Sequence, residues 1–104
     1  MPNFVLAYTG GNQPQGDAER EASMQAWGAW FGQIGSSVVD AGNPFAGSST
    51  VASSGAVSNG NASGLTGYTV VTAADMNGAV AIAKGCPHLQ VGGAVEVHEI
   101  FPIM

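Results

Sequence analysis

The fold is constrained most by the alternation of strand-like apolar runs with longer segments that have helical apolar spacing. Residues 3–9, 65–73 and 94–101 are short runs that contain many β-branched and aromatic side chains. A helical pattern follows the first run, and a second helical pattern separates the last two runs. This order predicts an α+β domain in which helices cover one face of an antiparallel sheet.

The first helical segment is predicted to begin near Asp17 and to end before 41–44. Asp17 can cap the free backbone amides, and Glu19 and Glu21 are favoured by the positive end of the helix dipole. Apolar side chains at steps of three and four predict one buried stripe of about six turns, formed by Met24, Trp27, Phe31, Ile34 and Val38. A parallel row of glycines indicates that the sheet, the other helix or a partner packs closely there, at Gly28, Gly32 and Gly35.

The second helix is predicted to follow Asp75, which can cap it. Its inward face is expected to contain Met76, Ala79, Val80 and Ala83. Gly85, Cys86 and Pro87 form a strong helix stop. Residues 46–64 are rich in Ser, Gly and Asn, which indicates either a short irregular hairpin with arms at 50–51 and 56–58 or a mobile loop.

The predicted order β-α-β-(β)-β-α-β is typical of a ferredoxin-like sandwich. The chain has 104 residues, so we expect one domain, 1–104. Charged residues make up only 9% of the chain, well below the usual quarter or so. Such a chain has little charge with which to solvate the uncovered face of its sheet. We therefore expect a second copy to cover that face in a homodimer.

Charge and composition exclude several classes of function. The formal net charge is −5 and the only cationic side chains are Arg20 and Lys84, which disfavours binding to nucleic acid and to anionic membranes. No run approaches the roughly 18 apolar residues of a membrane span, and the N-terminal residues lack the pattern of a signal peptide. With one cysteine, Cys86, no internal disulfide can form. We expect a cytoplasmic protein.

Five segments, in order over nearly the whole chain, form a recognisable set, at residues 26–32, 39–44, 64–68, 84–89 and 95–100. Together they resemble the YCII-related family, and more closely its DGPF-type branch. The resemblance implies a dimeric α+β barrel, in which two ferredoxin-like domains face each other through their sheets. It also implies a possible active site, because some relatives are thought to pair a histidine of the first helix with an aspartate near the second strand.

Asp40 matches the aspartate of that pair, whereas the histidine is missing. The predicted first helix contains no histidine, and Gln25 occupies the corresponding position. The Asp-Gly-Pro-Phe signature of the branch is also absent, and residues 59–62 read Asn-Gly-Asn-Ala. The resemblance therefore supports the fold more strongly than any reaction.

Asp40, His98 and Tyr8 are the candidate catalytic residues. Asp40 could serve as a general base in a dimer cleft, or simply bond the backbone of its turn. Alternation along 94–101 places Glu96 and His98 opposite the helices, where they could orient a ligand or form an exposed polar pair. Tyr8 ends the first strand and could place its hydroxyl at the mouth of a cleft.

Trp30 and His88 are further candidates for ligand binding, beside Glu96. Trp30 lies about 60° around the helix from the apolar stripe, so it could line a cavity, although packing in the core or at an interface explains it as well. His88 could form a nucleophilic pair with Cys86, or anchor its loop through a backbone hydrogen bond. The spacing of Cys and His fits no metal motif, and no phosphate-binding glycine motif is present, so we predict neither a metal nor a cofactor.

Two classes of function remain. The first is a non-catalytic homodimer that binds a small ligand or a regulatory partner. The second is an enzyme that performs acid/base chemistry in the dimer cleft, with Asp40 as the base and His98 and Tyr8 orienting the substrate. The missing helix histidine favours the first class.

Overall fold

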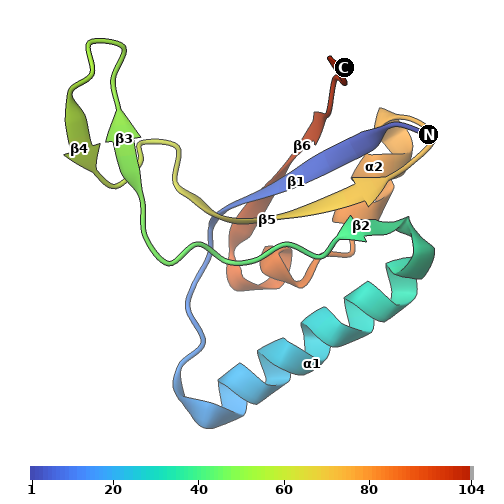
Figure 1. The fold of residues 1–104 in the computed structure, drawn as a ribbon. Helices are drawn as coiled ribbons and strands as arrows, with labels where there is room; N and C mark the ends of the chain where they lie inside the picture. Colours follow the sequence, from blue (N-terminus) through green and yellow to red (C-terminus); the bar gives the residue numbers. More distant parts are fainter. Residues whose placement is uncertain (104) are drawn as a thin grey trace.

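Strand β1 (Asn3–Gly10) lies inside the four-stranded sheet, antiparallel to β5 (Leu65–Thr72) on one side and β6 (Gly93–Glu99) on the other. A short strand, β2 (Val38–Asp40), extends the sheet along the free side of β5, which gives the order β2-β5-β1-β6 (Figure 1). The computed structural model describes residues 1–103. The predicted α+β class with an antiparallel sheet and two α-helices is confirmed.

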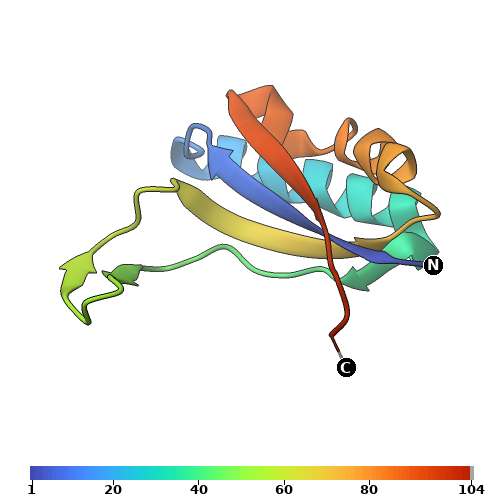
Figure 2. The same ribbon diagram turned by 90° about the horizontal axis from the view of Figure 1, so that it is seen from above.

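Both α-helices lie on one face of the sheet (Figure 2). Because side chains alternate along a strand, every second residue of β1 and β5 points into the core beneath α1 (Gly16–Ile34) and α2 (Met76–Ala83). The fully buried side chains of these strands are Phe4, Leu6, Thr69 and Val71. The intervening residues form the opposite face of the sheet, which we call the open face, with Val5 paired to Val70 across β1 and β5.

Helix α1 differs from its prediction at both ends. Gln15, rather than Asp17, is the N-cap residue, and Asp17 instead pairs with Arg20 at 3.0 Å. The helix ends at Ile34 because Gly35 takes a φ of 42°, a value that favours glycine. After a short 3₁₀ turn, η1 (Gly35–Ser37), the chain becomes β2, so Val38 belongs to the sheet rather than to the helix.

The predicted apolar stripe of α1 is only partly buried. Trp27, Phe31 and Ile34 pack against the core, whereas Met24 is 75% exposed, so its predicted burial is wrong. The expected close packing on the glycine row is also absent within the described part of the chain. A Cβ added at Gly28 or Gly32 would meet no atom outside the helix within 4 Å.

Helix α2 follows its prediction more closely. Asp75 caps it by accepting a hydrogen bond of 2.8 Å from the Gly78 amide. Ala79 and Ala83 are buried as expected, but Met76 remains 40% exposed at the edge of the helix. After the predicted stop, the chain forms a 3₁₀ helix, η2 (Pro87–Val91), that leads into β6.

The predicted hairpin is present but does not join the main sheet. Its arms, β3 (Ser49–Val51) and β4 (Val57–Asn59), form a separate two-stranded sheet that projects from the body (Figure 1). All residues of both arms are exposed. None of the helices in the described residues 1–103 is long and apolar enough to cross a membrane.

Candidate functional site

A half-open cleft of about 930 Å³ lies on the helix side of the sheet. Its walls are one side of α1, the last residues of β1, the first half of β5, and η2. Two loops, 10–14 and 41–44, complete the rim. This volume is near the upper end of the range for small-molecule sites. In the text below, "the cleft" means this space.

Both rim loops are held by hydrogen bonds, so the cleft is formed without a ligand. The Asn12 amide donates to the Val91 carbonyl at 2.9 Å, which joins loop 10–14 to η2. The Tyr68 amide donates to the Asn43 carbonyl at 3.3 Å, which joins loop 41–44 to β5. Gly42 packs so closely on the Tyr68 carbonyl that a side chain would not fit.

Tyr8 lies at the bottom of the cleft and is only 6% exposed. Its hydroxyl donates to Oγ1 of Thr69 at 2.6 Å, and Thr69 Oγ1 donates to the Ala41 carbonyl at 2.9 Å. Burial raises the pKa of Tyr8 well above its ordinary value. The hydroxyl therefore remains protonated and serves as a fixed polar group rather than as a base.

Aromatic rings line the cleft beside Tyr8. The Trp27 ring meets the Tyr8 ring edge to face, with centroids 5.4 Å apart, and the Phe31 centroid lies 5.9 Å from that of Trp27. The His88 ring also lies beside the Tyr8 ring, with a centroid distance of 5.4 Å. Together they give the cleft an apolar, aromatic surface suited to a flat ligand.

His88 anchors its loop to the end of β1, as one of the two sequence interpretations predicted. Its Nε2 lies 2.9 Å from the Thr9 carbonyl oxygen, which is an acceptor, so Nε2 carries the proton. Gly93 packs directly against the imidazole, and a Cβ at Gly11 would lie 2.7 Å from its Cε1. The ring is therefore fixed by its surroundings, with one edge in the wall of the cleft.

Cys86 has the environment of a core residue. Its side chain is 1% exposed, and burial raises the pKa of the thiol. A nucleophilic cysteine needs an accessible thiolate of lowered pKa. This geometry gives no support to the alternative in which Cys86 and His88 form a nucleophilic pair.

Trp30 packs in the core, as one of its sequence interpretations predicted, whereas Trp27 of the predicted buried stripe also borders the cleft. Trp30 is 3% exposed and packs in the core, where its Nε1 donates to the Ile82 carbonyl at 3.3 Å. Trp27 is partly exposed and lines the cleft. The tryptophan that lines the cleft is thus Trp27, and Trp30 contacts it edge to face with centroids 5.6 Å apart.

Asp40 lies outside the cleft, at the end of the edge strand β2. Its Oδ1 accepts from the Gly42 amide at 2.9 Å, as predicted for a turn residue, and its Oδ2 accepts from the Tyr68 hydroxyl at 3.2 Å. The negative charge of Asp40 raises the pKa of Tyr68. Both side chains are on the open face, since Asp40 pairs with Val70 and Tyr68 pairs with Ala7.

Glu96 and His98 lie on the open face at the opposite edge of the sheet. The predicted alternation along β6 is present, with Val95 and Val97 partly buried and Glu96 and His98 exposed. His98 Nε2 lies 2.9 Å from Glu96 Oε1, and both side chains are about 60% exposed (61% and 59%).

The three candidate catalytic residues do not come together within one chain. Strands β2 and β6 are separated by β5 and β1, which places Asp40 and His98 about 14 Å apart at the usual strand spacing. Tyr8 points to the other face of the sheet, toward the helices. Among residues 1–103, no three His, Cys, Asp or Glu side chains gather as a metal site would require.

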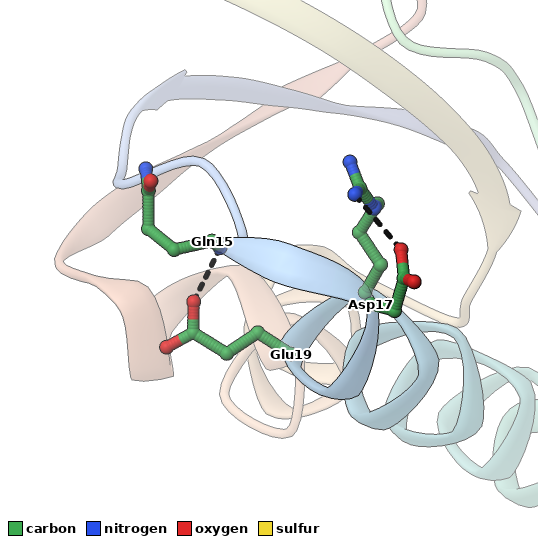
Figure 3. A network of polar contacts seen from close by, with 4 residues as sticks. Gln15, Asp17 and Glu19 are labelled. Carbon is green, nitrogen blue, oxygen red and sulfur yellow. Dashed lines mark hydrogen bonds and ion pairs between the residues drawn. The ribbon is translucent and has the colours of Figure 1, made fainter.

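Glu19 lines the mouth of the cleft, whereas the sequence predicts only that the helix dipole favours it. Its carboxylate turns back and accepts a hydrogen bond from the Gln15 amide at the start of α1 (Figure 3). Sequence reasoning also missed Phe31 and the two rim loops as parts of a site. The available signal was the pair of aromatic residues one turn apart, Trp27 and Phe31, on a helix that follows a glycine-rich loop.

No family model matches this chain, and no match was found among curated proteins or among solved structures.

Proposed function

We propose that this protein is a non-catalytic, homodimeric binding protein that holds a small, largely apolar ligand in the cleft. The observation that carries the proposal is the cleft itself, a preformed space of about 930 Å³ whose bottom and walls are aromatic. Ligand sites of this size are mostly apolar and contain a few fixed polar groups. Here the Tyr8 and Thr69 hydroxyls are such groups.

Binding fits these residues better than acid/base catalysis. The titratable groups nearest the bottom of the cleft already form hydrogen bonds within the protein. Tyr8 donates to Thr69, and His88 donates to the Thr9 carbonyl. Cys86 is buried beneath them. A general base must reach the proton it abstracts, and Asp40 is on the other face of the sheet.

The homodimer forms through the open face in this proposal, as a dimeric α+β barrel of two ferredoxin-like units. The strand order β2-β5-β1-β6 supports this arrangement, since β1, the first strand of this sheet in the chain, lies between the third, β5, and the last, β6. The centre of the open face is apolar, with Val5 beside Val70. The segment after β6 adds Phe101, which is 82% exposed, and Ile103, which is 85% exposed.

A thermal-shift screen with small aromatic compounds tests the ligand-binding function. A ligand that binds only the folded state raises the melting temperature by mass action. We expect hits for the wild type, and for each hit we expect the shift to be lost in Trp27→Ala, which opens one wall of the cleft. Asp40→Asn is the matched control, because Asp40 lies outside the cleft.

Two outcomes would contradict the proposal. Hits that survive Trp27→Ala but disappear in Asp40→Asn would move the site to the open face and would favour the enzyme alternative. The absence of any hit in a screen that spans neutral, cationic and anionic aromatic compounds would leave the cleft without a ligand-binding role.

A further inference from the structure

The charge on the lining of the cleft is of one sign, negative. Of the described residues that line it, Glu19 is the only Asp, Glu, Lys or Arg. Its carboxylate is positioned at the mouth by the Gln15 amide, which bonds Oε2 (Figure 3). A ligand that enters the cleft therefore meets one fixed negative charge, beside aromatic rings whose faces are also electronegative.

Neither cationic side chain of the described residues lines the cleft. Arg20 follows Glu19 on α1, but its guanidinium pairs with Asp17 at 3.0 Å. Lys84 ends α2 and lines a separate shallow depression beside β6. With a formal net charge of −5, the long-range field of the protein also attracts cations and repels anions.

We propose that the cleft selects organic cations that carry a flat aromatic body, and that it disfavours carboxylate and phosphate ligands of the same shape. This inference rests on the proposed ligand-binding function. The aromatic body would pack against the ring of Trp27, and the ammonium group would point toward Glu19, which lies about two turns nearer the start of α1. An anion in that position would meet the carboxylate with no positive side chain among the lining residues to compensate it.

Ligands that share one ring and linker and differ in the charge of the end group provide the test. Tryptamine, tryptophol and indole-3-propionate share one ring system and carry a cation, a neutral hydroxyl and an anion at pH 7. Phenethylamine, phenethyl alcohol and 3-phenylpropionate form a second, smaller series. Affinities are measured by isothermal titration calorimetry at low salt, where a partly exposed charge acts most strongly.

We expect the amine of each series to bind about fivefold more tightly than the alcohol, and the acid about fivefold more weakly. Glu19→Gln removes the charge but keeps an oxygen that can accept from the Gln15 amide. In this variant the ratio of amine to alcohol affinity should fall to about two, because the aromatic faces still attract a cation. Arg20→Gln is the control and should leave the ratio unchanged.

The outcomes separate this inference from the proposed function. If the alcohols bind and depend on Trp27 while the amines bind no more tightly, the charge selection is wrong and the binding function stands. If the acids bind most tightly and lose that advantage in Arg20→Gln, Arg20 recruits anions and the inference is overturned. If no member of either series binds, both the inference and the aromatic-ligand function fail.

Discussion

The Tyr8 hydroxyl on β1 donates a 2.6 Å hydrogen bond to Oγ1 of Thr69 on β5, diagonally across the two strands. Thr69 Oγ1 in turn donates a hydrogen bond of 2.9 Å to the Ala41 carbonyl. One hydroxyl therefore connects the bottom of the cleft with the loop that forms its rim. Such a network stabilises the fold and shapes the cleft at the same time.

Tyr8→Phe should lower the free energy of unfolding by about 1 kcal/mol, because it removes one buried hydrogen bond and little volume. Thr69 keeps its bond to the Ala41 carbonyl, which limits the loss. Urea denaturation measures the change. Tyr68→Phe is the matched control, since the Tyr68 hydroxyl bonds the exposed Asp40, and it should change stability by less than about 0.5 kcal/mol.

Stability should fall at alkaline pH because burial raises the pKa of Tyr8 in the folded state. The unfolded chain loses this proton near pH 10, whereas the folded chain keeps it, so the contribution is complete below pH 10 and declines above it. The titration of Tyr8 can lower the free energy of unfolding by at most about 1.4 kcal/mol for each pH unit. Urea denaturation from pH 8 to 11 should show a shallower decline in Tyr8→Phe. Equal slopes would show that Tyr8 does not titrate differently on folding.

Cys86 should cause a further loss of stability that begins at a lower pH than the loss from Tyr8, since burial also raises the pKa of its thiol. An unfolded cysteine ionises near pH 8.5, so the contribution is complete below this pH and begins to decline above it. Cys86→Ala should remove this part of the decline, measured by the same urea titrations. A thiol that reacts rapidly with a maleimide at pH 7 in the folded protein would contradict its burial.

Gly93→Ala should destabilise the protein by about 2 kcal/mol, because the added methyl group would overlap the His88 ring. In His88→Ala the space is free, so the same glycine substitution should cost much less in that background. Chemical denaturation of the four proteins gives this coupling energy. Gly47→Ala is the control, since a Cβ there meets nothing within 4 Å. If Gly93→Ala destabilises the protein equally with and without the His88 side chain, His88 is not fixed against Gly93.

Val70→Asp should convert the proposed homodimer into a monomer, because it places a charge at the apolar centre of the open face. Sedimentation equilibrium should give twice the chain mass for the wild type and the chain mass for the variant. Val51→Asp on the projecting hairpin is the control and should remain dimeric, since Val51 lies outside the open face. A monomeric wild type at micromolar concentration would contradict the dimer.

The sequence located the long strands and the second helix because their signals are local. β1, β5 and β6 follow from β-branched and aromatic runs, and Asp75 combines a cap with a clear helical pattern. Strand β2 could not be separated from α1 in the same way. Val38 lies four residues after Ile34 and so continues the helical spacing, and only the positive φ of Gly35 ends the helix.

The candidate site was harder to predict because it depends on how α1 is rotated and how closely it approaches the sheet. Trp27 and Trp30 are three positions apart, so the spacing could not decide which one faces the core and which one lines the cleft. His88 was recognisable as an anchor, but its partner, the Thr9 carbonyl, lies 79 positions away in the chain. Asp40 and His98 are placed at opposite edges by the strand order, which no local pattern encodes.

The unequal environments of the two indoles give this protein a built-in pair of optical reporters. Trp30 is buried in the core, so its emission should follow unfolding, whereas Trp27 borders the cleft, so its emission should change when the proposed ligand binds. With Trp27→Phe and Trp30→Phe, each signal can be recorded alone. Folding and binding of the proposed ligand can then be followed separately in the two variants, without any attached dye.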